Sequence, residues 1–200
     1  MACKGTGANC HLGNAASWIH RGIFPSDHWD LVGERKPIFK GGLHCPALTR
    51  VPFIWRDPAR PRVSPASAAL AQTIDIAATV LERVGLPATN GMQGQSLLPL
   101  MDGVASAVRG HRLIEEESQR SDFGMDRRVR MRTLRDHHHR LTIDDGQSCG
   151  ERYDLAQDPL DLRNLWNHTA SQPLRQSLSE QLARAMLAAA DTCPCPDATA

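Results

Sequence analysis

The first half of the chain shows one strand-like and one helix-like pattern of apolar side chains. Apolar and polar positions alternate over residues 50–56, which predicts a strand, and Pro52 confines it to a sheet edge or a strand end. Over residues 75–84 the apolar positions recur at helical spacing. We expect Asp75 to be the N-cap of this helix and Gly85 to end it.

The second half predicts several short strands and then a helix. Alternating patterns fall on residues 112–115, 128–133, 141–143 and 153–155. Leucine and methionine then recur every fourth position over residues 174–186, which predicts an amphipathic helix capped by Ser171. Strands followed by a helix favour a small α+β layer packed on something larger.

These patterns divide the chain into four parts. Residues 1–22 have no sustained period and are expected to be irregular or poorly ordered, and the proline-rich residues 191–200 are expected to be a flexible tail. Between them, residues 23–103 predict a piece of an α/β domain, and residues 104–190 predict an antiparallel sheet with a helix. The fold class expected is therefore α/β with a small antiparallel α+β subdomain.

Composition excludes several classes of protein. Lys and Arg number 23 against 22 Asp and Glu, so a nucleic-acid partner bound by bulk charge is not expected. No apolar run approaches the roughly 20 residues that a membrane-spanning helix needs, and the N-terminus lacks a secretory pattern, which makes a cytoplasmic location the default expectation. The six cysteines show neither disulfide nor zinc-site spacing, so free thiols are expected.

Candidate chemistry gathers between residues 26 and 44. An apolar segment leads into Asp27 and His28, the arrangement that α/β sheets use at strand ends where ligands bind. Asp27 offers a hard oxygen ligand for a divalent cation, and His28 offers a nitrogen ligand or a hydrogen bond. Lys40 could hold an oxygen of an anionic group, with His44 nearby in sequence. The residues alone also allow a turn aspartate beside a surface histidine.

Three further polar clusters favour solvent-exposed surfaces. Residues 137–139 are consecutive histidines between two predicted strands, where neighbouring side chains point to opposite faces. Residues 115–117 are consecutive glutamates, and residues 127–132 carry an arginine stripe without interleaved aromatic side chains. None of these clusters predicts a metal or nucleic-acid site.

Five segments occur in an order that resembles the later part of the sulfatase family, within the alkaline phosphatase superfamily. They are Ser26-Asp27-His28 with Lys40-Gly41, the segment 50–56, the segment 73–86, Gly94-Gln95-Ser96-Leu97-Leu98-Pro99-Leu100, and the closing series Tyr153-Asp154-Leu155, Asp158-Pro159 and Asn164-Leu165.

The resemblance implies a fold and a reaction. Residues 23–103 would be the C-terminal piece of an alkaline-phosphatase-like α/β/α sheet, and residues 104–190 the antiparallel subdomain. The implied reaction is hydrolysis of a sulfate ester or sulfamate on a small molecule or glycan. Asp27 and His28 would then bind a divalent cation, usually calcium, Lys40 would bind the sulfate as a catalytic residue, and His44 would be a further catalytic candidate.

The family's formylglycine nucleophile arises from Cys or Ser in a C/S-x-P-x-R motif, which we expect this chain to lack. The family's first metal-binding Asp pair also has no place, because only 26 residues precede Asp27. Trp29 stands where the family has Gly, which puts the backbone path beside the metal in doubt. We therefore expect the C-terminal portion of a sulfatase, inactive alone.

Other functions remain open at this point. A phosphodiesterase or phosphonate hydrolase of the same superfamily would use the same residue types. A non-catalytic remnant or binding module would keep only the C-terminal subdomain, and half of an α/β sheet could fail to fold independently. Nothing in the residues identifies the substrate, because specificity depends on pocket loops rather than on the fold.

Overall fold

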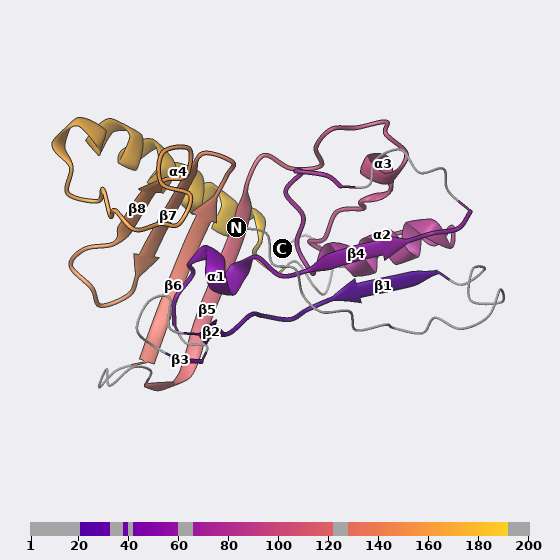
Figure 1. Ribbon diagram of the computed structural model, residues 1–200, viewed down its shortest axis with the longest axis horizontal. Coiled ribbons are helices and arrows are strands. Elements are labelled where there is room, and N and C mark those ends of the chain that lie inside the picture. Colours follow the sequence, from indigo (N-terminus) through magenta and orange to yellow (C-terminus); the bar gives the residue numbers. More distant parts are fainter. Residues whose placement is uncertain (1–20, 33–37, 40–41, 60–65, 122–127, 192–200) are drawn as a thin grey trace, which may run out of the picture.

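The computed structural model describes residues 21–32, 38–39, 42–59, 66–121 and 128–191 (Figure 1). The predictions for residues 1–20, for Lys40 and for most of the tail lie outside this part of the chain. Within it, none of the helices combines the length and the apolar character needed to cross a lipid bilayer.

The N-terminal part contributes short antiparallel pairs of strands. Strand β1 (Gly22–Pro25) pairs with β4 (Phe53–Arg56), and β2 (Leu31–Val32) pairs with β3 (Ile38–Phe39). The strand predicted over residues 50–56 is confirmed, and it begins just after Pro52, whose ring leaves no amide for a ladder bond. A single-turn helix, α1 (Pro46–Thr49), lies between β3 and β4 in sequence.

Helix α2 (Asp75–Arg83) confirms the predicted helix and its end, but not its cap. Gly85 follows with φ of 76°, a conformation that glycine adopts without steric cost. Asp75 is the first helical residue and not the N-cap, which is Ile74. The buried Asp75 carboxylate instead accepts hydrogen bonds from the backbone amide of Gln72 at 2.7 Å and that of Gln95 at 2.9 Å.

The loop from α2 to the C-terminal sheet is fixed by close contacts. Arg109 donates to the Asp75 carboxylate and to the side chain of Gln72, which in turn donates to the carbonyl of Leu113 at 2.9 Å. A Cβ atom at Gly94 would lie 2.1 Å from the carbonyl oxygen of Ile74, so only glycine fits there. Helix α3 (Leu98–Met101) follows this close approach.

A four-stranded antiparallel sheet forms the second half, in the order β5-β6-β7-β8. The strands are β5 (Arg112–Ser121), β6 (Arg128–Arg135), β7 (His139–Asp144) and β8 (Glu151–Asp154). All four were predicted, and the first runs further than expected. Each histidine of the 137–139 cluster lies at or beside the turn from β6 to β7, which Asp136 closes by accepting the amides of His138 and His139.

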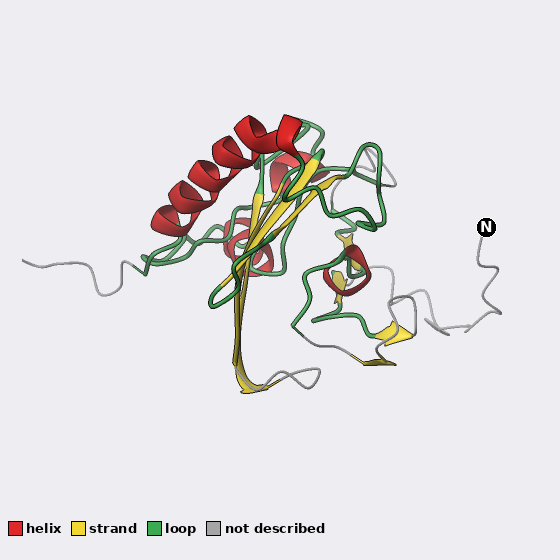
Figure 2. Cartoon of the chain, turned by 90° about the vertical axis from the view of Figure 1, so that its left-hand side faces the viewer, coloured by secondary structure: helices red, strands yellow, loops and turns green. Residues whose placement is uncertain are grey.

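Helix α4 (Gln172–Ala188) covers one face of this sheet (Figure 2). The shared core is apolar and consists of Leu134, Leu141, Leu178, Leu182 and Ala185. Ser171, the last residue of the short helix η2 (Thr169–Ser171), precedes α4 as predicted. The capping bond is absent, because the Ser171 hydroxyl donates to the carbonyls of His168 and Leu165 at 2.8 and 3.3 Å.

The segment that leads into α1 covers the opposite face. The Nδ1 of His44 forms a hydrogen bond of 2.7 Å with the hydroxyl of Thr133 on β6. Gly42 lies against Val129 on the same strand, where an added Cβ would approach the valine methyls to 2.8 Å. Thr133 and Val129 point away from α4, because side chains alternate along a strand and Leu134 points toward the helix. The sheet is therefore the middle layer of three.

Candidate functional site

Asp27 and His28 form a polar turn directly after β1. The Nε2 of His28 lies 3.4 Å from a carboxylate oxygen of Asp27, and its Nδ1 lies 3.7 Å from a carboxylate oxygen of Asp30. Ser26 closes the turn by donating its hydroxyl to the carbonyl of His28 at 2.8 Å. The Asp27 side chain is 85% exposed and that of His28 34%. The turn thus brings one imidazole and two carboxylates to the surface.

Trp29 connects this turn to α1. Its backbone amide donates to the carbonyl of Leu48 at 3.4 Å, and its side chain lines a shallow cavity of about 200 Å³ with Pro46, Ala47 and Arg50. Asp161 is the one non-glycine residue with a positive φ in the described part of the chain. The backbone at Trp29 therefore needs no glycine, and the substitution for the family's Gly introduces no strain here.

A calcium ion requires six to eight oxygen ligands. Among the residues that the structure describes, no three His, Cys, Asp or Glu side chains are arranged to hold a metal ion. Asp27 and His28 supply two ligands, and Asp30 beside them does not complete a metal site, so these residues do not by themselves fit a calcium site. Lys40, the predicted sulfate ligand, lies outside the described residues.

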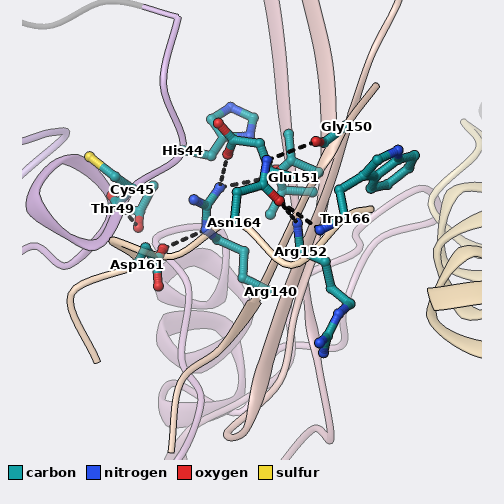
Figure 3. Close-up of polar contacts among 12 residues, drawn as sticks. His44, Cys45, Thr49, Arg140, Gly150, Glu151, Arg152, Asp161, Asn164 and Trp166 are labelled. Atoms are coloured by element: carbon teal, nitrogen blue, oxygen red, sulfur yellow. Dashed lines mark hydrogen bonds and ion pairs between the residues drawn. The ribbon is translucent and has the colours of Figure 1, made fainter. Parts of the chain in front are cut away.

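His44 lies in a buried polar network rather than at the surface (Figure 3). It is 5% exposed, and its partner Thr133 bonds in turn to the hydroxyl of Thr142 at 2.7 Å. Burial, together with the positive charges of Arg140 and Arg132, lowers the pKa of His44 to about 4. The imidazole is therefore neutral at pH 7 and joins the N-terminal segment to the sheet. Its catalytic role stays a prediction.

Arg140 lies at the centre of the same network (Figure 3). Its Nε donates to Asp161 at 2.5 Å, and its Nη1 donates to Glu151 and to the hydroxyl of Thr142, each at 2.9 Å. The guanidinium also lies over the ring of Tyr153, 4.4 Å from its centre. Both Arg140 and Asp161 are almost fully buried. Pairing of this quality is what a buried charge requires.

Sequence reasoning missed Arg140 and Asp161, although a signal was present. Asp161 falls inside the closing series of the family resemblance, between Asp158 and Asn164. In the structure Asn164 accepts the amides of Arg152 and Trp166 at 3.1 and 2.9 Å. The closing series therefore holds the end of β8 and the following loop in place, and this structural role explains its residue types.

The expectation that the chain lacks a C/S-x-P-x-R motif is wrong. Ser171-Gln172-Pro173-Leu174-Arg175 does fit the letters of C/S-x-P-x-R. The structure places this segment at the start of α4, where a proline is favoured in the first turn. The Ser171 hydroxyl is engaged with two carbonyls, and the Arg175 guanidinium stacks 4.6 Å from the ring centre of Trp166. The requirements of a helix start account for this match.

Helix α4 and the His44 segment lie on opposite faces of the sheet, as Figure 2 shows for the helix. The turn of Asp27 and His28 is tied to the His44 side through Trp29 and α1. Ser171 is consequently separated by the sheet from the residues predicted to bind metal. Ser171 does not line the shallow cavity beside the start of α4.

The glutamate and arginine clusters pair with each other. Arg132 forms ion pairs with Glu115 at 2.7 Å and Glu117 at 2.5 Å across β5 and β6, and Arg130 lies 3.5 Å from Asp145. The ion pair with Arg132 lowers the pKa of Glu117. These contacts are consistent with the solvent-exposed surface expected from the sequence.

Comparison with known families covers most of the chain. The family described as N-sulphoglucosamine sulphohydrolase, C-terminal, matches residues 43–188. The chain belongs to this sulfatase family. The match includes the four-stranded sheet, α4 and the buried network around Arg140. It confirms the resemblance to the sulfatase family, and four of the five segments lie inside it. No curated protein matches the sequence significantly.

Solved structures share the fold. A phosphonate monoester hydrolase of Agrobacterium radiobacter has a TM-score of 0.78 at 24% identity. The matched region covers 90% of this chain and 37% of the hydrolase chain. A putative sulfatase from Bacteroides thetaiotaomicron has a TM-score of 0.78 at 20% identity, with coverages of 94% and 40%. These similarities confirm the mixed α/β fold.

A third similar structure holds D-glucosamine-2-N,6-O-disulfate as its substrate, with a TM-score of 0.72 at 20% identity and coverages of 89% and 36%. The chain thus spans about two fifths of the length of the structures that it matches. It corresponds to one part of each of these larger proteins.

Proposed function

We propose that this chain provides the C-terminal portion of a hydrolase that cleaves a sulfate ester or sulfamate, with a sulfated sugar as the substrate class. The observation that carries the proposal is the match of residues 43–188 to a sulfatase C-terminal family. The buried network that links His44 to the sheet supports it, because it gives the N-terminal segment one fixed position against the subdomain.

In this proposal the polar turn faces the reacting group. Asp27 and His28 would contribute two ligands to a divalent cation such as calcium, and its other ligands would have to come from outside the described residues. Lys40 holds a sulfuryl oxygen and offsets its negative charge. Hydrolysis also needs a nucleophile, and the engaged hydroxyl of Ser171 does not supply one. We therefore expect the 200 residues alone to be inactive.

The first experiment measures the chain by itself. Purified chain should show no turnover of an aryl sulfate, and calorimetry should show at most weak calcium binding that Asp27→Asn abolishes. Steady turnover that disappears with Asp27→Ala would contradict the expected inactivity. A cooperative thermal transition with no calcium binding at all would favour the alternative of a non-catalytic binding module.

The second experiment restores the rest of the fold. The corresponding C-terminal part of the Bacteroides thetaiotaomicron structure is replaced by this chain, and turnover of an aryl sulfate is measured. Asp27→Ala and Lys40→Ala should each remove turnover, because the first removes a proposed ligand of the cation and the second removes positive charge that stabilises the sulfuryl oxygens. Arg184→Ala, an exposed change on α4, serves as the control. Full activity of the Lys40→Ala chimera would refute the role of Lys40.

A phosphonate hydrolase is the second candidate. The similarity to the Agrobacterium radiobacter enzyme, at a TM-score of 0.78, favours it. Cations that offset charge on a sulfuryl group also offset charge on a phosphonate group. The chimera should therefore be assayed with a phosphonate monoester beside the aryl sulfate, and the ratio of the two kcat/KM values decides between the candidates.

A further inference from the structure

Three arginines lie side by side across the C-terminal sheet. Arg112 on β5 is directly opposite Arg135 on β6, which is in turn opposite Arg140 on β7. Directly opposed residues of an antiparallel pair share a face, and these three share the face of Thr133, on which His44 packs. Like charges in opposed positions destabilise a sheet. The row therefore requires negative charge from elsewhere.

Only one end of the row is neutralised within the described part of the chain. Arg140 is paired with Asp161 and Glu151. Arg135 is 8% exposed, yet its Nε and Nη1 are buried without a hydrogen-bond partner, and the buried Nε of Arg112 also lacks one. In the regions that the structure describes, no carboxylate forms an ion pair with Arg112 or Arg135. The negative charges of Asp161 and Asp136 raise the pKa of Arg135, but only from beyond ion-pair distance.

A fourth guanidinium connects the row to solvent. Arg50, at the end of α1, is exposed and close enough to both Arg112 and Arg135 to lower their pKa values by repulsion. It also lines the shallow cavity beside Trp29. Burial is the largest cause for both groups, and together with the repulsion it lowers the pKa of Arg112 to about 10. The charges thus run from an exposed Arg50 to a buried Arg135.

Desolvated charge without a partner is costly, and a guanidinium offers a planar fork of donors that matches the oxygens of an oxyanion. A single carboxylate would neutralise only one of three neighbouring cations, whereas a dianion neutralises two. We propose that Arg50, Arg112 and Arg135 form a binding site for a tetrahedral oxyanion, either free sulfate or phosphate or the sulfate group of a sugar. The proposal goes beyond the hydrolase function and rests on this chain alone.

Direct binding is the first test. Calorimetry on the full 200-residue chain, at constant ionic strength and with millimolar sodium sulfate, should show saturable binding. Arg135→Gln and Arg112→Gln should each weaken this binding at least ten-fold. Arg130→Gln is the matched control, because it removes the same charge from β6 at an exposed position already paired with Asp145, and it should leave binding unchanged.

Melting temperature is the second readout, and it separates a binding role from a structural one. In chloride buffer, Arg135→Gln should melt at a higher temperature than the parent chain, because an unpaired buried charge is gone. In sulfate the order should reverse, because only the parent chain gains from binding. If Arg135→Gln melts lower in both buffers, the arginine has a structural role and the proposal is overturned.

Further variants and anions complete the test. If Arg135→Gln fails to fold, Arg50→Gln at the exposed end and the half-buried Arg112→Gln carry the same comparison. The proposal is overturned if sulfate changes the melting temperature of the parent chain and of these variants equally, or changes neither. It is also overturned if acetate binds saturably and sulfate does not. Tighter binding of glucosamine 6-sulfate than of inorganic sulfate identifies a sugar as the source, and equal binding identifies the free anion.

Discussion

The two faces of the β5–β8 sheet are closed in different ways. On the α4 side, the contact is made by leucines, with Leu134 and Leu141 on the sheet against Leu178 and Leu182 on the helix. On the other side, hydroxyls and charged groups meet, with His44 on Thr133 and Arg140 on Asp161. Both faces exclude water, although their chemistry is opposite.

The two faces therefore have different roles: one holds a helix on the sheet, and the other fixes the position of a segment. Apolar burial is favourable in proportion to area and has little directional preference, so the leucine face holds α4 on the sheet. Hydrogen bonds at 2.7 Å fix partners in one geometry and penalise every alternative that leaves a buried group unpaired. The polar face therefore sets the position of the segment that carries His44, and with it the neighbouring Asp27 turn.

The largest effect is expected on the polar face. Asp161→Asn keeps the shape and tolerates the φ of 54°, but it leaves the buried guanidinium of Arg140 without its strongest partner. Breaking a buried pair in this way costs about 3–5 kcal/mol of unfolding free energy. Urea denaturation measures the loss. Glu180→Gln, which breaks an exposed pair with Arg184, is the control and should cost about 0–0.5 kcal/mol.

If Asp161→Asn costs no more than this surface change, the network around Arg140 does not hold the polar face together. The comparison of the two faces would then fail, since the leucine face alone would account for the stability of the sheet.

The leucine face should respond to loss of volume. Leu182→Ala leaves a cavity beneath α4, where this side chain is 2% exposed, and should cost about 2–5 kcal/mol in the same urea experiment. Leu187→Ala is the matched control, because Leu187 lies on the same helix but is 77% exposed. Similar losses for both variants would mean that α4 does not dock through its leucine stripe.

Acid should weaken the polar face first. The pKa of His44 is about 4 when folded and 6.5 in the unfolded chain, so the unfolded state binds more protons between these values. The contribution of His44 is fully present above pH 6.5 and is lost as the pH falls toward 4. It amounts to on the order of 3 kcal/mol at about 1.4 kcal/mol per pKa unit.

Urea denaturation across this pH range measures the effect, and His44→Gln should flatten the profile. Asp57 also has a lowered pKa, through its hydrogen bond with Arg83, but it starts from 3.8 and so acts below this window. A His44→Gln profile as steep as that of the parent chain between pH 4 and 6.5 would assign the pH dependence to other groups.

Local periodicity was sufficient to predict much of the fold. The strands of the second half and α4 depend on alternation and on four-residue spacing, which are properties of neighbouring residues. The end of α2 at Gly85 is local in the same sense. The role of Asp75 was mispredicted because its carboxylate bonds to Gln95 and Arg109, far along the chain. A cap and a buried tertiary acceptor look alike in the sequence.

The candidate site was only partly predictable, for a similar reason. Asp27 and His28 adjoin in sequence, and their turn is where it was expected, after a strand. The bond from His44 joins residues 89 positions apart, and that from Arg140 to Asp161 spans 21. Arg135 was missed because side chains alternate between the two faces of a strand. Arg135 therefore lies on the opposite face of β6 from Arg132 and the ion-paired arginines beside it.

The smallest expected effect tests a single hydroxyl of the polar face. Thr133→Val keeps the volume but leaves the Nδ1 of His44 and the hydroxyl of Thr142 without this partner, which should cost about 1–3 kcal/mol in urea denaturation. Thr133→Ser keeps the hydroxyl and removes only a methyl group, so it is the matched control. If directional bonding positions the His44 segment, Val must cost more than Ser. The reverse order would mean that this face, like the leucine face, is held by packing.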